Sequence, residues 1–268
     1  MKLSGAGAIL IETAYAKINL ALHVRGRRDD GYHELETVFA FCEHGDVVMA
    51  EPADTLSLTI DGPFAAGLST TDNLIIRAAE AMRVTAKLHL TKNLPVASGI
   101  GGGSADAAAT LRVLTRLTGQ SEPSLDVQRA LGADVPACVL AQTMRGDGVG
   151  EALSPAEAVT GTPVLLVNPR IPLSTAAVFK TWDGFDRGLL SDWRDGRNDL
   201  EAPASALVPE IAGLITFLAS RHDVTLARMS GSGATCYALF TSEEARGIAV
   251  TQVRAQFPDY WTMASVLR

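Results

Sequence analysis

The sequence is poor in the residues that define small disulfide-bonded or metal-bound proteins. Its 268 residues include only three cysteines and five histidines. Cys42, Cys138 and Cys236 are far apart and form no CxxC pair, so neither a zinc ribbon nor a disulfide framework is expected. The histidines have no metal-site spacing. An odd set of unpaired thiols instead predicts a reducing, cytoplasmic compartment.

Long hydrophobic runs are also missing. No segment approaches the roughly 18 consecutive apolar residues of a membrane helix. Ala212–Ala219 comes nearest, and Thr216 interrupts it. Gly5–Ile11 is weakly apolar, but it is short and Glu12 follows it directly, which is not the pattern of a signal peptide. The sequence therefore predicts a soluble protein.

An excess of positive charge is absent as well. Lysine and arginine number 23 against 30 aspartates and glutamates, a formal net charge of −7. This balance argues against a protein that coats nucleic acid or binds a membrane surface. An anionic small molecule is still allowed, because a pocket can be locally positive. With 47% hydrophobic residues, the chain can bury a sizeable core in one large domain or two lobes.

The residue pattern predicts strands and helices in mixed order. Ile18–Val24 alternates apolar and polar residues, which predicts a strand with one buried face. The other predicted strands are 35–41, 47–50, 56–60, 88–91, 164–167, 225–229, 235–240 and 262–266, and the predicted helices are 73–84, 104–119, 124–131, 135–142, 174–182, 209–219 and 242–256. Residues 203–209 form the only stretch that looks loosely structured. The second half is typical of a small α+β lobe.

The strongest chemical signal is the glycine-rich segment Pro95–Ala105, which lies between a predicted strand and a predicted helix. Glycines let a backbone approach a phosphate, and a helix start supplies N–H groups and a positive dipole end. The segment lacks the Lys-Ser/Thr ending of a Walker A loop, and Ser104 replaces the third glycine of a dinucleotide fingerprint. It is either another kind of phosphate loop or a flexible turn. Gly148–Glu151 and Ser230–Ala234, each taken alone, are more typical of hairpin turns.

Several polar residues allow two interpretations each. Lys17, among apolar and small residues, is either a solvated strand end or a cation held in a site. Asp134 precedes a predicted helix with Pro136 in its first turn, so it is either an N-cap or a functional carboxylate. Tyr32 and His33 either face a ligand or start a half-exposed strand. No nucleophile-elbow context for a catalytic serine is present.

Taken together, these segments resemble the GHMP kinases, the superfamily of galactokinase, homoserine kinase and mevalonate kinase. Pro95–Ala105 is similar to their phosphate-binding motif, and Met229–Phe240 is similar to their C-terminal glycine motif. Within the superfamily, the resemblance is strongest to kinases of a cytidine-diphosphate-linked methylerythritol. The segments that carry it are Ala16–Leu20, Gly26–His33, Asp72–Ile75, Gly132–Pro136, Gly148–Glu151 and Arg197–Glu201. They span nearly the whole chain.

The resemblance implies a two-lobed α+β fold, with an N-terminal nucleotide-binding lobe over residues 1–160 and a smaller C-terminal substrate lobe over residues 161–268. It implies ATP-dependent phosphorylation of the 2-hydroxyl of the cytidyl substrate, in the non-mevalonate route to isoprenoid precursors, with Mg²⁺ screening the triphosphate. Another GHMP kinase and a non-catalytic nucleotide-binding homologue are the alternatives. The presence of both Lys17 and Asp134 argues against the second. A monomer or homodimer is expected, without nucleic-acid or membrane partners.

The resemblance also implies roles for individual residues. Lys17 and Asp134 would form the catalytic pair. The nucleotide would contact Asn73 and Lys92 beside adenine, and Pro95, Gly99, Gly101, Gly102, Gly103 and Ser104 at the phosphates. Asn19 and Thr175 would contact the substrate, and Tyr32, His33 and Phe179 would hold its cytosine. No metal ligand can be named. Asp106, in the first turn of the predicted helix, is expected to point away from the phosphates.

Overall fold

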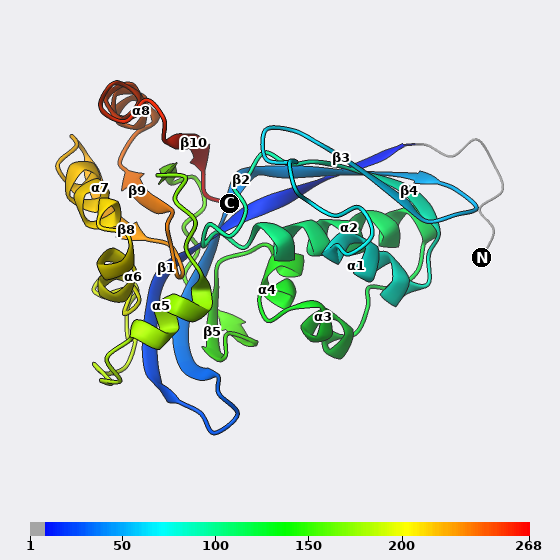
Figure 1. The fold of residues 1–268 in the computed structure, drawn as a ribbon, viewed down its shortest axis with the longest axis horizontal. Coiled ribbons are helices and arrows are strands. Elements are labelled where there is room, and N and C mark those ends of the chain that lie inside the picture. Colours follow the sequence, from blue (N-terminus) through cyan, green and yellow to red (C-terminus); the bar gives the residue numbers. More distant parts are fainter. Residues whose placement is uncertain (1–8) are drawn as a thin grey trace. The chain divides into compact units, whose positions relative to one another are not determined.

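A computed structural model describes residues 9–268 (Figure 1). Within it the chain forms two compact units. Unit 1 combines the described residues up to Ala16 with His44–Val96 and Gly101–Ala141, and unit 2 combines Lys17–Glu43, Ala97–Ile100 and Gln142–Arg268. Each unit gathers separated segments, and the expected division at residue 160 stays a prediction. Two long strands, β1 (Leu10–Arg27) and β2 (His33–Pro52), contribute residues to both units.

Unit 1 is a small sheet with helices. Strand β4 (Ala86–Thr91) pairs antiparallel with β2 and parallel with β3 (Ser57–Asp61). The helices are α1 (Leu74–Met82), α2 (Gly102–Thr118), α3 (Leu125–Leu131) and α4 (Val135–Leu140). Helix α2 packs against α1 and α4 through a buried alanine-rich face, because small side chains let neighbouring helices approach. Gly119, at φ 70°, ends α2 as the sequence predicts.

Unit 2 has an antiparallel sheet in the order β10 (Trp261–Val266), β7 (Pro163–Asn168), β9 (Cys236–Phe240) and β8 (Val224–Met229). Its helices are α5 (Thr175–Thr181), α6 (Glu201–Leu207), α7 (Glu210–Ala219) and α8 (Glu243–Gln256). Every residue of β7 is buried. Strand β5 (Met144–Gly148) pairs with β2 and with β6 (Ala152–Pro155), so Gly148–Glu151 is a hairpin turn, as expected.

Three expectations about local structure are wrong. Residues 203–209 are mostly helical, because Pro203 is the third residue of α6, where a backbone N–H has no intrahelical acceptor. Strand Ile18–Val24 is buried on both faces, since the Asn19 amide bonds Thr37 and the His23 ring bonds the Gly188 carbonyl. Helix α2 starts at Gly102 rather than Ser104, which places Asp106 beyond the first turn.

The three cysteines are buried and are not joined by disulfide bonds in the described structure. Burial raises the pKa of the Cys42 thiol to about 12 and also raises the pKa of Cys236. In the described part of the chain, no helix has the length and apolar character needed to cross a membrane. Most of the weakly apolar segment Gly5–Ile11 lies outside the described residues.

Candidate active site

Lys17 is a buried cation in unit 2. It is 4% exposed, its Nζ donates to Asn19 Oδ1 at 3.0 Å, and Nζ lies 5.2 Å from the centroid of the Phe39 ring. Asn19 is oriented by its own Nδ2, which donates to Thr37 Oγ1 at 2.8 Å. Lysine is rarely buried without such partners. The solvated strand-end interpretation of Lys17 is therefore wrong, and the structure brings the predicted site residues Lys17 and Asn19 together.

The two glycine segments that the sequence singles out separately meet in unit 2. Ser230 Oγ donates to the Gly99 carbonyl at 2.9 Å and accepts the Asn19 backbone N–H at 3.2 Å. Gly99 has φ +77°, and a Cβ there would lie 2.4 Å from the Ser230 carbonyl oxygen. Only glycine fits this approach. The Asn198 amide donates to the Met229 and Gly231 carbonyls at 2.8 Å each, so the Arg197–Glu201 segment supports the second loop.

The start of α2 in unit 1 is built to receive an anion. Gly101 caps the helix at φ 65°, and the first N–H groups of a helix have no acceptor within it. A Cβ on Gly102 would lie 3.2 Å from Lys92 Nζ, so an ammonium group lies beside this turn. A Cβ on Gly132 would lie 3.6 Å from Ser104 Oγ. The segment that carries Asp134 therefore lies at the same helix start.

Asp134 is half-buried and directly precedes α4. In the described structure its side chain makes no capping hydrogen bond to that helix, so the N-cap interpretation is not supported. Asp134 belongs to unit 1 and Lys17 to unit 2. Their pairing as catalytic residues stays a prediction.

The side chains of Lys92 and Asn73, the two residues expected beside adenine, form ion pairs or hydrogen bonds with other residues of the protein. Lys92 is 3% exposed, and its Nζ lies 2.6 Å from an oxygen of Asp46 and 2.6 Å from one of Asp106. The Asn73 side chain caps α1 by accepting the Ile75 N–H at 3.0 Å, while its Nδ2 donates to the Ser69 carbonyl at 3.1 Å. Contacts with adenine stay a prediction for both residues. Sequence reasoning did not find the Asp46 partnership, which joins positions 46 residues apart.

The ring of His33 contacts two aromatic side chains of unit 2, Phe179 and Trp182, and the three form an aromatic cluster. The ring centroid of His33 lies 4.6 Å from that of Phe179 and 5.6 Å from that of Trp182. His33 Nε2 is buried without a hydrogen-bond partner in residues 9–268, and burial lowers the pKa of the ring, so the imidazole is neutral near pH 7. Tyr32 is 63% exposed. Trp182 was missed by the sequence reasoning, although it lies one turn after Phe179, where helical spacing predicts a shared face.

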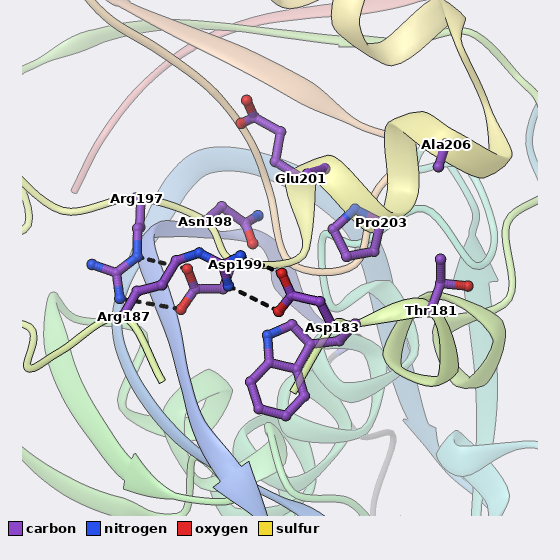
Figure 2. A pocket seen from close by; sticks show the side chains of 11 residues that line it. Thr181, Asp183, Arg187, Arg197, Asn198, Asp199, Glu201, Pro203 and Ala206 are labelled. Atoms are coloured by element: carbon purple, nitrogen blue, oxygen red, sulfur yellow. Dashed lines mark hydrogen bonds and ion pairs between the residues drawn. The ribbon is translucent and has the colours of Figure 1, made fainter. Parts of the chain in front are cut away.

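Two further features of unit 2 adjoin these groups. Thr175, the first residue of α5, shares a hydrogen bond of 2.8 Å with Ser232 of the second glycine loop. A pocket of about 420 Å³ lies between the end of α5 and α6 (Figure 2). Trp182 is one of the residues that line it. Arg197 and Asp199, which also line this pocket, form an ion pair at 2.6 Å. The Arg197–Glu201 segment thus reaches both the glycine loop and this pocket.

Comparison with known proteins defines the class. A family model described as the GHMP kinases N terminal domain matches residues 73–142, and one described as GHMP kinases C terminal matches residues 175–259. A crystal structure of a homoserine kinase from Cytophaga hutchinsonii has a TM-score of 0.73 at 14% identity, covering 100% of this chain and 98% of that one, which shows the shared fold. The chain is a GHMP kinase, an ATP-dependent small-molecule kinase, and the expected α+β fold is confirmed.

More similar proteins narrow the class. The 4-diphosphocytidyl-2-C-methyl-D-erythritol kinase of Rhizorhabdus wittichii is 51% identical over 96% of this chain and 94% of its own, and that of Novosphingobium aromaticivorans is 50% identical over 98% and 95%. A crystal structure of a 4-(cytidine 5'-diphospho)-2C-methyl-D-erythritol kinase has a TM-score of 0.81 at 31% identity, over 96% and 99% of the two chains. The chain belongs to the 4-diphosphocytidyl-2-C-methyl-D-erythritol kinase family.

Proposed function

We propose that this chain transfers the γ-phosphoryl group of ATP to the 2-hydroxyl of 4-diphosphocytidyl-2-C-methyl-D-erythritol. The observation that carries the proposal is the start of α2 in unit 1, where helix N–H groups, the Lys92 ammonium group and the segment before Asp134 lie together. In a member of the 4-diphosphocytidyl-2-C-methyl-D-erythritol kinase family, this arrangement supplies groups that can bind a triphosphate and, close to them, the carboxylate of Asp134.

Phosphoryl transfer requires positioning and neutralisation of charge more than covalent help from the protein. Asp134 accepts the proton of the 2-hydroxyl as its oxygen attacks Pγ, a contribution of roughly 10²–10⁴-fold. The new O–Pγ bond forms while the bond from Pγ to the β-phosphate breaks, and ADP leaves with the electron pair. In this proposal the buried ammonium group of Lys17 stabilises the negative charge that develops on the attacking oxygen.

The cytidyl end of the substrate binds to the aromatic cluster of His33, Phe179 and Trp182 in unit 2. A base stacked on Phe179 and Tyr32 would cover ring surface, and its polar edge would give the partnerless His33 Nε2 a hydrogen bond. Asn19 and Thr175, which are tied to the second glycine loop through Ser230 and Ser232, contact the methylerythritol. This assignment explains why a small-molecule kinase carries aromatic side chains at these positions.

Mg²⁺ enters this proposal as part of the substrate MgATP. Magnesium is commonly held by substrate phosphates, several waters and only one or two carboxylates. No cluster of three or more metal-binding side chains occurs within residues 9–268, and this mode of binding needs none. The proposal also includes a cytoplasmic location, which three thiols outside disulfide bonds favour in the described chain, and a monomer or homodimer as the active form.

A coupled assay of ADP release tests the proposal directly. The purified chain is given MgATP with 4-diphosphocytidyl-2-C-methyl-D-erythritol, mevalonate, homoserine or galactose in turn. We expect turnover with the cytidyl substrate alone. Faster turnover of another alcohol would assign the chain to a different GHMP activity, and ATP binding without any turnover would indicate a non-catalytic homologue.

A further inference from the structure

A buried cluster of three charges lies behind the phosphate-binding turn of unit 1. The Lys92 ammonium group, directly after β4, is shared between Asp46 Oδ2 of β2 and Asp106 Oδ2 of α2, both at 2.6 Å. The three residues are between 0% and 4% exposed. With all groups ionised, the cluster carries one uncompensated negative charge. That charge lies beside the start of α2, where it would oppose the binding of an anion.

The cluster also holds the two ends of the glycine segment in unit 1. Asp46 Oδ1 accepts the backbone N–H groups of Asn93 and Leu94 at 2.6 and 2.8 Å, which fixes the chain just before Pro95. Asp106 lies one turn into α2, just after the phosphate-binding residues. Lys92 therefore links Asp46, which binds the backbone just before the glycine-rich segment, to Asp106, which follows that segment. Its Nζ also lies close to Gly102 at the start of α2.

Asp106 is the member whose charge can change. Its Oδ1 is buried without a hydrogen-bond partner among the described residues. Burial, together with the neighbouring Asp46 carboxylate, raises the pKa of Asp106 to about 7, although Lys92 opposes the rise. The other elements packed on α2 offer no competing charge: α4 (Val135–Leu140) has no charged side chain, and those of α1 and α3 are exposed. They are Arg77, Glu80, Asp126 and Arg129.

We propose that Asp106 is a positioning residue, acting through Lys92, that couples triphosphate binding to the uptake of a proton by its own carboxylate, to an extent that depends on pH. The proposal rests on the proposed function only for the identity of the anion. A triphosphate at the start of α2 brings negative charge to the Lys92 ammonium group, which weakens the hold of that group on the Asp106 carboxylate. Protonation of Asp106 then removes the uncompensated charge, and Lys92 is left between Asp46 and the phosphates.

The coupling has a defined sign. Since the anion favours the protonated form of Asp106, a proton is taken up on binding, and by reciprocity the affinity for the triphosphate falls as the pH rises through about 7. If the bound state raises the pKa of Asp106 by one to two units, the affinity falls about tenfold between pH 6.5 and 8.5. The Asn variant at this position cannot titrate, so this dependence is lost.

Calorimetric titration tests the coupling. A non-hydrolysable ATP analogue with saturating Mg²⁺ is titrated into the full chain near pH 7.5, in two buffers of different ionisation enthalpy. We expect uptake of about half a proton more by the wild type than by Asp106→Asn. The terminal phosphate of the analogue also titrates, and because it contributes equally to both proteins, the difference isolates Asp106. Asp126→Asn, which removes an exposed carboxylate of the same unit, is the matched control and should behave as wild type.

The outcomes separate the two proposals. Equal proton uptake by wild type and Asp106→Asn, with ordinary turnover of the cytidyl substrate, would overturn the coupling and leave the proposed function intact. A loss of uptake in Asp126→Asn would also overturn it, because a surface charge would then be responsible. Failure of the analogue to bind the wild type would overturn both proposals.

Discussion

Replacing Lys92 by methionine removes the cation that pairs with two buried carboxylates, those of Asp46 and Asp106. Methionine keeps most of the side-chain volume, so the loss is mainly one of charge. Asp46 is fully buried and Asp106 nearly so, and neither can turn to water. Removing one partner from a buried ion pair costs about 3–5 kcal/mol. We expect the free energy of unfolding of Lys92→Met to fall by about that amount near pH 8.

The loss of unfolding free energy in Lys92→Met depends on pH, and the titration of Asp106 determines whether that loss grows or shrinks as the pH rises. The pKa of Asp106 in the folded chain is about 7, above its usual 3.8, so its contribution to stability is complete below about pH 4 and is lost as the pH rises through 7. Lys92 lowers that pKa, and without it the folded pKa rises further. The substitution should therefore cost least near pH 5.5, and each further pH unit above 7 adds about 1.4 kcal/mol until the new pKa is reached.

Urea unfolding followed by circular dichroism, at about pH 5.5 and about pH 8, measures this effect. Lys87→Met is the matched control, because Lys87 pairs with Glu51 at 3.5 Å on the exposed side of β4 and should change stability by less than about 1 kcal/mol. The double variant Lys92→Met/Asp106→Asn should regain part of the loss near pH 8. Equal effects of Lys92→Met and Lys87→Met would refute the buried-cluster reasoning. A stable Lys92→Met chain with weakened ATP binding would favour a contact of Lys92 with adenine.

Three further predictions concern the proposed site. Asp134→Asn should fold normally, as its side chain does not cap α4, yet lose turnover by about two to four powers of ten in the ADP-release assay; near-normal turnover would remove Asp134 from the chemistry. Gly101→Val should weaken calorimetric binding of a non-hydrolysable ATP analogue and spare the cytidyl substrate, because valine resists φ 65°; unchanged affinity in a folded variant would count against the loop. Tyr32→Ala should raise KM for the cytidyl substrate by roughly five- to hundredfold at about 1–3 kcal/mol per stacked base, with KM for ATP nearly constant; the reverse pattern would exchange the two nucleotide sites.

Local patterns in the sequence were sufficient for most of the elements. Glycine density located both loops, and Gly119 correctly marked the end of α2, because these signals act through backbone geometry at the residues themselves. The prediction for residues 203–209 is wrong because the effect of a proline on a helix depends on its position, and Pro203 lies in the first turn of α6. In the first turn of a helix, its missing N–H costs nothing. The boundaries of the two units lay beyond this reasoning, since each unit combines separated segments.

The site was predicted less completely than the fold, for a physical reason. Motifs single out Lys17, Asn19 and His33 as candidates, but they do not show which residues contact them, because those partners come from distant segments. Ser230, which accepts the Asn19 N–H, lies 211 positions away. Lys92 shows the limit most clearly: its position suggested a ligand contact, and only the fold shows that Asp46 and Asp106 surround it.

The reactivity of the buried thiols can be used to measure how often the folded chain opens to solvent. Alkylating reagents attack the thiolate, and Cys42 and Cys236 are both covered and held protonated by their raised pKa values. Their modification must therefore follow a fluctuation that admits solvent. Cys138 of α4 belongs to unit 1, while Cys42 and Cys236 belong to unit 2. The rate of alkylation at each cysteine, followed by mass spectrometry with and without nucleotide, would therefore report the opening of each unit separately in the native protein.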